Sequence, residues 1–160
     1  MRILGVDPGT GICGFGVLEV PKKGAPILLD SGAITTPPHT PLPDRLLDIF
    51  DSLNQIIKED KPDCISIEKL FFMQNITTGI SVAEARGVVM LVAAQNHLPI
   101  FEYSPNEIKK AMTGYGHADK KQMQEMVRVY LKMDKIIKPD DAADAVAAAI
   151  VHSMFCKNNI

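Results

Sequence analysis

Residues 2–20, RILGVDPGTGICGFGVLEV, decide the fold that we expect for this chain. Residues 2–7 predict a short buried strand, the Pro-Gly-Thr-Gly of residues 8–11 predicts a tight turn, and residues 14–20 predict a second strand. Residues 27–35 follow another turn and predict a third strand. Because the links between them are short, the three strands are expected to form an antiparallel meander.

Helix and strand patterns alternate along the rest of the chain. Thr40 and Pro41 are typical of an N-cap and a first helical position, and the apolar residues after them have helical spacing as far as Glu59. The other expected elements are a strand over residues 64–68, a helix over 78–96, a strand over 98–103, a short helix from the capping box at Ser104 to Gly114, and helices over 119–131 and 139–156.

The bulk properties fit one α/β domain over residues 1–160. The chain is 46% hydrophobic and 22% charged, as is ordinary for a folded domain, and the order βββαβαβ followed by helices predicts a mixed five-stranded sheet flanked by helices. The longest apolar run, around residues 87–94, is too short for a membrane span, and the chain opens on a strand pattern without a signal peptide. Three cysteines without CxxC spacing indicate a reduced, cytoplasmic protein.

Charge is unevenly distributed along the chain. The net charge is −2, yet residues 1–60 carry five basic and eight acidic side chains, a net −3, and residues 105–138 carry eight basic and four acidic, a net +4. Such a cationic segment can bind phosphate, although a solvated helix face explains it equally well. The segment includes Lys109, Lys110, Lys120 and Lys121.

Carboxylates stand at the ends of three of the expected elements. Asp7 ends the first strand and Glu68 ends the fourth, while Asp140, Asp141 and Asp144 open the last helix. Each has a structural explanation by itself, as a turn cap, a surface residue or a partner of the helix dipole. Gathered at one sheet edge they would repel one another, unless divalent cations neutralised them. Helical spacing places both Asp140 and Asp141 on the same face as Asp144, so it does not choose between them.

Several motifs, in this order, resemble the RuvC family of Holliday-junction endonucleases, which have a ribonuclease-H-like fold. The motifs are GVDPGTGICGFGV at 5–17, SIEKLFF at 66–72, EARGVV at 84–89, FEYSPNEIKKAMTGYGHADKKQMQEMV at 101–127 and DDAADAVAAAI at 140–150. Together they span nearly the whole chain. The resemblance implies a metal-dependent endonuclease that resolves four-way DNA junctions in recombination and repair, by paired symmetric nicks that leave 5′-phosphates.

The resemblance also implies the identity of the catalytic residues. The family's four catalytic carboxylates correspond to Asp7, Glu68, Asp141 and Asp144, so the register of the DAADA segment selects Asp141 rather than Asp140. These carboxylates are expected to bind two Mg²⁺ ions, with Mn²⁺ as a substitute, for in-line hydrolysis of the phosphodiester.

Basic and aromatic residues near the carboxylates are expected to contact DNA. Lys120 and Lys109 correspond to family residues that contact the junction, and Lys120 is expected to act in catalysis by steadying the scissile phosphate. Phe71, three residues after the catalytic glutamate, is expected to stack on an unpaired base. Lys69 replaces the glutamine of several relatives and adds a phosphate contact. The expected DNA-binding residues are Phe71, Lys69, Lys109, Lys110 and Lys121.

The resemblance implies partners as well: a second copy of the chain, bound through the small residues of the helix over 78–96, and the RuvA–RuvB branch-migration complex.

Other classes of protein share parts of the pattern. A nuclease of the same fold that processes ribosomal RNA precursors usually has Arg-Ile-Gly at residues 12–14 and lacks the DAADA helix. An actin-like ATPase needs two such domains. A non-catalytic junction-binding module needs the basic segment but not four carboxylates.

Overall fold

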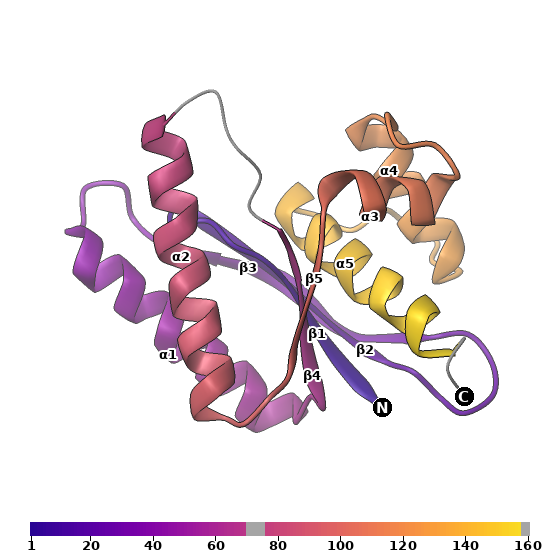
Figure 1. Cartoon of the computed structure of the whole chain (residues 1–160), viewed down its shortest axis with the longest axis horizontal. Helices are drawn as coiled ribbons and strands as arrows, with labels where there is room; N and C mark the ends of the chain where they lie inside the picture. Colours follow the sequence, from indigo (N-terminus) through magenta and orange to yellow (C-terminus); the bar gives the residue numbers. More distant parts are fainter. Residues whose placement is uncertain (70–75, 158–160) are drawn as a thin grey trace.

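A mixed sheet forms the centre of the molecule (Figure 1). The computed structural model describes residues 1–69 and 76–157, and in this part of the chain the sheet has five strands in the order β3-β2-β1-β4-β5. The pairs β1–β2 and β2–β3 are antiparallel, and β1–β4 and β4–β5 are parallel, so the expected meander and mixed sheet are confirmed. The strands are β1 (Arg2–Asp7), β2 (Ile12–Glu19), β3 (Ile27–Thr35), β4 (Cys64–Glu68) and β5 (Ile100–Tyr103).

Helices cover both faces of the sheet. In Figure 1, α1 and α2 lie on one face, while α5 crosses the other face with α3 and α4 beside it. No helix in the described part of the chain is long and apolar enough to cross a membrane. The helices are α1 (Leu42–Asp60), α2 (Ile76–Gln95), α3 (Pro105–Thr113), α4 (Lys120–Tyr130) and α5 (Asp140–Lys157).

Alternation along the strands divides the core into two clusters, one on each face of the sheet. In β4, Ile65 and Ile67 pack into the cluster formed with α1 and α2, whereas Cys64 belongs to the cluster formed with α5. Ser66 faces the same side as Cys64, because its hydroxyl donates to the carbonyl oxygen of Ala148 in α5 at 2.8 Å. The same alternation turns Glu68 towards α5, where it lines a cavity with Asp144 and Ala147.

Helix α5 lies unusually close to the strands beneath it. A Cβ atom placed on Gly5 would lie 2.0 Å from the carbonyl oxygen of Ala145, and one on Gly14 would lie 2.0 Å from that of Asp141. The helix contributes mainly small side chains to this contact, and Ala142 and Ala145 are fully buried. The backbone of α5 therefore packs directly on the backbone of β1 and β2. This places the acidic start of α5 over the end of β1 and the beginning of β2.

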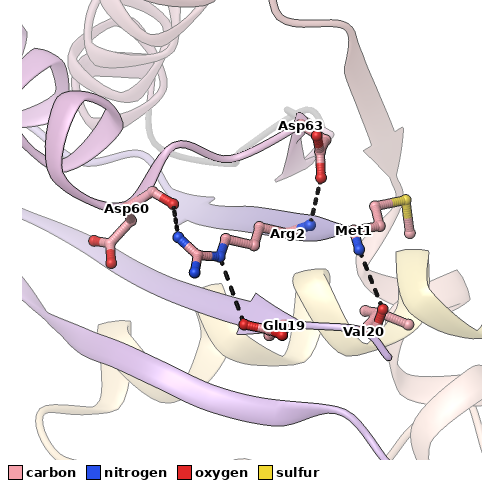
Figure 2. A network of polar contacts seen from close by, with 6 residues as sticks. All are labelled: Met1, Arg2, Glu19, Val20, Asp60 and Asp63. Carbon is pink, nitrogen blue, oxygen red and sulfur yellow. Dashed lines mark hydrogen bonds and ion pairs between the residues drawn. The ribbon is translucent and has the colours of Figure 1, made fainter. Parts of the chain in front are cut away.

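The opposite end of β1 is tied down by a polar network (Figure 2). The backbone N–H of Arg2 donates to Asp63 at 2.6 Å, and its guanidinium donates to the carbonyl oxygen of Asp60 at 2.6 Å. The guanidinium also lies 3.6 Å from the carboxylate of Glu19, and the N-terminal amine donates to the carbonyl oxygen of Val20 at 3.2 Å. These contacts link β1 to β2 and to the segment between α1 and β4.

Several element boundaries differ from the sequence predictions by one or two residues, and hydrogen bonds explain two of these differences. Thr40 is not the N-cap of α1: its N–H donates to the carbonyl oxygen of Pro37, so it belongs to the preceding turn, and Pro41 caps the helix without a side-chain hydrogen bond. Strand β5 begins after Leu98, because the N–H of Leu98 donates back to Ala93 and continues the end of α2. The predicted capping box at Ser104 is confirmed.

Candidate active site

Asp7 lies at the centre of a group of carboxylates. It ends β1, and burial raises the pKa of Asp7 to about 7, together with the negative charges of Asp144, Glu68 and Asp141. Lys120 acts in the opposite direction. Three segments that are far apart in the sequence therefore deliver acids to one place, as the sequence predicts.

The sheet explains why Glu68 is near Asp7. Strands β1 and β4 are parallel neighbours with Val6 opposite Ile67, so their last residues lie at the same edge. Burial, followed by the charge of Asp144, raises the pKa of Glu68, and Lys109 partly offsets this effect. Burial and neighbouring negative charges thus disfavour the charged forms of Asp7 and Glu68.

The structure distinguishes the two aspartates between which helical spacing does not choose. Asp140 is exposed and turned towards α4, where its carboxylate accepts a hydrogen bond from Gln124 at 2.7 Å and lies 3.1 Å from Nζ of Lys120. The charge of Asp141 raises the pKa of both Asp7 and Asp144, whereas the charge of Asp140 contributes only to that of Asp144. The assignment of Asp141 to the site stays a prediction from the resemblance.

Two lysines face the carboxylates across a cavity of about 230 Å³. Lys120, the first residue of α4, places Nζ 3.7 Å from the carboxylate of Asp144 and 3.1 Å from that of Asp140. Lys109 of α3 lines the same cavity. Two lysines and two of the carboxylates, Glu68 and Asp144, thus line one cavity, with Lys120 paired directly to Asp144. The lining residues are Glu68, Pro105, Ile108, Lys109, Lys120, Met123, Asp144 and Ala147.

The chemistry of this group suits a divalent cation. All four candidate ligands offer carboxylate oxygens, which Mg²⁺ and Mn²⁺ prefer, and the repulsion that raises the pKa of Asp7 is the kind that a cation relieves. Among the described residues, no three His, Cys, Asp or Glu side chains are already spaced to hold a metal ion.

Among the described residues, the remaining predicted DNA contacts do not line this cavity. Phe71 lies outside the described residues. The Lys69 side chain is exposed just after β4, and the residue's N–H donates to the carbonyl oxygen of Tyr103 at 2.7 Å. Lys110 and Lys121 are exposed on α3 and α4 and do not line the cavity.

Sequence reasoning missed Cys13 as a neighbour of the site. The residue is fully buried, and burial, with smaller contributions from Asp7 and Asp141, raises the pKa of its thiol to about 12. The thiol therefore stays protonated and behaves as an apolar residue beside the carboxylates. Its place in the alternating pattern of β2 is the only sequence signal that could have indicated this.

A family model described as "Crossover junction endodeoxyribonuclease RuvC" matches residues 3–152. The chain belongs to the RuvC family. Curated proteins named crossover junction endodeoxyribonuclease RuvC from Desulfitobacterium hafniense and Chloroflexus aggregans are 51% and 49% identical to it, over 96% of this chain and 92% and 93% of theirs. The predicted family and its endodeoxyribonuclease class are thereby confirmed.

Solved structures of RuvC have the same fold. The structure of Thermus thermophilus RuvC aligns with a TM-score of 0.91 and 30% identity, over 99% of this chain and 97% of that one. The same protein "in complex with Holliday junction substrate" aligns with a TM-score of 0.93 and 29% identity, over 99% and 96%. The ribonuclease-H-like architecture is therefore confirmed, and RuvC-family endonucleases are in general metal-dependent.

Proposed function

We propose that this chain resolves four-way DNA junctions by hydrolysing one phosphodiester in each of two opposing strands. The observation that carries the proposal is the gathering of Asp7, Glu68, Asp141 and Asp144 at one sheet edge, opposite two lysines. A relative of the same fold has been solved with a Holliday junction, which supports this choice of substrate.

In this proposal the four carboxylates hold two Mg²⁺ ions, for which Mn²⁺ can substitute. When bound, the ions supply a hydroxide nucleophile and stabilise the leaving 3′-oxygen, which leaves a 5′-phosphate on the product. Asp7, whose pKa is raised by the other three carboxylates, would be one of the residues that hold the ions. Lys120 would steady the scissile phosphate, and its contacts with Asp140 and Asp144 hold its ammonium group beside the site.

DNA binding extends from this centre over the cationic helices. Lys109 lines the cavity and is placed to meet a phosphate beside the scissile one. Lys69, Lys110 and Lys121 are exposed and can pair with backbone phosphates farther along the strand. Phe71 is proposed, from the resemblance alone, to stack on a base that is unpaired at the crossover.

A direct test uses a labelled mobile four-way junction and a linear duplex of the same composition, each with Mg²⁺ or with a chelator. We expect paired nicks in the junction only when Mg²⁺ is present, and no comparable cleavage of the duplex. Equal cleavage of both substrates would contradict junction specificity. Junction binding without cleavage in any divalent metal would instead favour a non-catalytic module.

The choice of Asp141 can be tested against its neighbour. We expect Asp141→Asn to lower the cleavage rate at saturating junction by at least about 10³-fold, as loss of a metal ligand does, and Asp140→Asn to lower it by less than about 10-fold. Single-turnover cleavage over a range of Mg²⁺ concentrations measures both. If Asp140→Asn has the larger effect, the assignment of Asp141 is wrong.

We also propose that two copies associate through α2. Ala83, Gly87, Met90, Leu91 and Ala94 are exposed and follow one another at helical spacing, and Leu91 is 59% exposed. A Cβ atom on Gly87 would meet nothing within 4 Å, so the centre of this stripe is open to a partner helix. A twofold dimer places two equivalent sites on one junction, as symmetric nicking requires.

The dimer predicts a clear effect of one substitution. Leu91→Glu should convert the protein to monomers at micromolar concentration, because a charge in an apolar helix contact is left without a partner. Sedimentation analysis reads the change, and paired nicking of a junction should give way to single nicks. The matched control is Val129→Glu, an exposed apolar residue of α4, which should leave the dimer intact. A dimeric Leu91→Glu protein would rule out this interface.

The proposal also covers the domain organisation of the chain, its location in the cell and a partner complex. Because one sheet serves both core clusters, we take residues 1–160 as a single domain. Action on chromosomal junctions places the protein in the cytoplasm. The RuvA–RuvB branch-migration complex is its proposed partner there, because that complex would move the junction to the sequence at which it is cut.

A further inference from the structure

A second pocket lies beside the turn between β1 and β2, near the starts of α1 and α2. Its volume is about 360 Å³. Its lining differs throughout from that of the cavity at the carboxylates, so the two are separate. The lining residues are Thr10, Leu42, Arg45, Ile80, Ser81 and Glu84.

Arg45 offers this pocket a positive charge that no acid neutralises. Among the described residues, no carboxylate lies within ion-pair distance of its guanidinium. Its Nε donates to the hydroxyl of Thr36 at 2.8 Å, and a Cβ atom on Gly11 would lie 3.4 Å from its Nη2. The guanidinium is therefore held against the glycine turn by one hydrogen bond, while its two Nη atoms make no hydrogen bond to the described residues.

A chain of hydrogen bonds fixes this arrangement. The buried Thr36 hydroxyl, which accepts from Arg45, donates to the carbonyl oxygen of Thr10. The Thr10 hydroxyl is in turn hydrogen-bonded to the hydroxyl of Ser81 in α2. The turn, α1 and α2 are thus linked through residues that are far apart in the sequence. An arginine and two hydroxyls meet at the pocket in a fixed geometry.

This set of groups has the chemistry of a phosphate site. A guanidinium and neighbouring hydroxyls are the side chains that most often bind backbone phosphates. Glu84 lines the same pocket and disfavours a doubly charged phosphate, but Arg45 can neutralise the single charge of a phosphodiester. Leu42 and Ile80 supply exposed apolar walls against which a deoxyribose can lie.

We infer that this pocket binds a phosphodiester of the DNA strand, as a second backbone site beside the one that is cut. The inference rests on the proposed function for the identity of the nucleic acid. Thr10 follows Asp7 by three residues, which limits their separation to about 11 Å. The pocket therefore lies close enough to the carboxylates for one DNA strand to reach both. The site would fix the register of the strand.

The test is the salt dependence of binding by Arg45→Gln. We expect the variant to bind a four-way junction about 10-fold more weakly at low salt, and the slope of log K against log salt to fall by about one. Arg2→Gln is the matched control: it removes an equal charge at the far end of β1 and should leave the slope unchanged.

A second variant distinguishes loss of the phosphate site from misfolding of the protein. Glu84→Gln should tighten binding several-fold, a gain that a damaged fold cannot produce, and should keep the salt slope of the wild type. Junctions that carry one neutral methylphosphonate linkage, moved in turn through the positions flanking the cut, locate the contact. One linkage should weaken binding by the wild type but not by Arg45→Gln.

The outcomes separate the inference from the function on which it rests. An unchanged slope in Arg45→Gln, or an equal fall in Arg2→Gln, would overturn the phosphate site even if junctions are cleaved normally. The same titrations on linear duplex DNA measure the contribution of Arg45 to the salt slope, even if the wild type shows no preference for junctions. In that case the proposed substrate fails, and the salt slope still decides the site.

Discussion

Asp7→Asn is expected to abolish junction cleavage, by about 10⁴-fold or more, and to leave junction binding within about threefold of the wild type. Asparagine keeps the shape of the side chain but removes the negative charge around which the other carboxylates are grouped. Single-turnover cleavage and a binding titration in Ca²⁺ measure the two effects. Undiminished cleavage would refute the role of Asp7.

The same substitution should stabilise the metal-free protein. The folded protein raises the pKa of Asp7 from 3.8 to about 7, so the folded state binds the proton more tightly than the unfolded chain does. The stabilisation from this proton is complete below about pH 4 and is lost as the pH rises through about 7. At pH 8, asparagine removes a penalty of the order of a few kcal/mol, and the melting temperature should rise.

Thermal melting in a chelator at several pH values, with and without Mg²⁺, checks this sign. The wild type should lose stability between about pH 5 and pH 8, Asp7→Asn should lose less, and Mg²⁺ should stabilise the wild type most at pH 8. Asp140→Asn is the control, because Asp140 is exposed and hydrogen bonds from Lys120 and Gln124 hold its pKa below the usual value. A metal-free wild type that gains stability above pH 6 would contradict the grouping of the carboxylates.

The second large effect is expected at the glycines beneath α5. Gly5→Ala or Gly14→Ala should cost more than about 3 kcal/mol, because the new methyl group would lie 2.0 Å from a backbone carbonyl oxygen of α5. The melting temperature should fall by roughly 6–12 °C. Cleavage at low temperature should fall as well, since α5 carries Asp141 and Asp144.

Gly87→Ala, made in the Leu91→Glu background so that the proposed dimer contact cannot interfere, is the matched control for this result. Within one chain a Cβ atom at Gly87 meets nothing within 4 Å, and alanine favours the helix by about 1 kcal/mol, so the double variant should melt at or above the temperature of Leu91→Glu alone. Calorimetry of the Gly5→Ala, Gly14→Ala and Gly87→Ala variants separates a steric effect from a general effect of alanine. If Gly5→Ala melts like the wild type, α5 does not sit on the strand in the way described.

Sequence patterns could predict the sheet and the three acidic positions because both depend on local signals. The alternation in residues 64–68 fixed the face of Glu68, and the glycines around Asp7 marked the turn after β1. The choice between Asp140 and Asp141 needed either the family register or the position of Lys120, which comes from another helix. Local spacing cannot contain that information.

The pocket at Arg45 could not be predicted from local sequence patterns. Its hydrogen bonds join Thr10 to Ser81 and Thr36 to Arg45, residues separated by 71 and 9 positions. Within the sequence, Arg45 is one charged residue of an amphipathic helix, and nothing near it indicates a ligand. Only the packing of α1 and α2 against the β1–β2 turn shows that the guanidinium has no acidic partner among the described residues.

The contact of α5 with the sheet has a consequence for redesign. Enzymes are commonly made heat-resistant by enlarging core residues or filling small gaps, and the fine alignment of a site can then be recovered by repacking side chains. At Gly5 and Gly14 there is no side-chain layer to repack, because carbonyl oxygens of α5 occupy the space. The alignment of the acids is set by two rigid main chains, so adaptation to new temperatures must act elsewhere, on loops, surface charges and the proposed dimer face of α2.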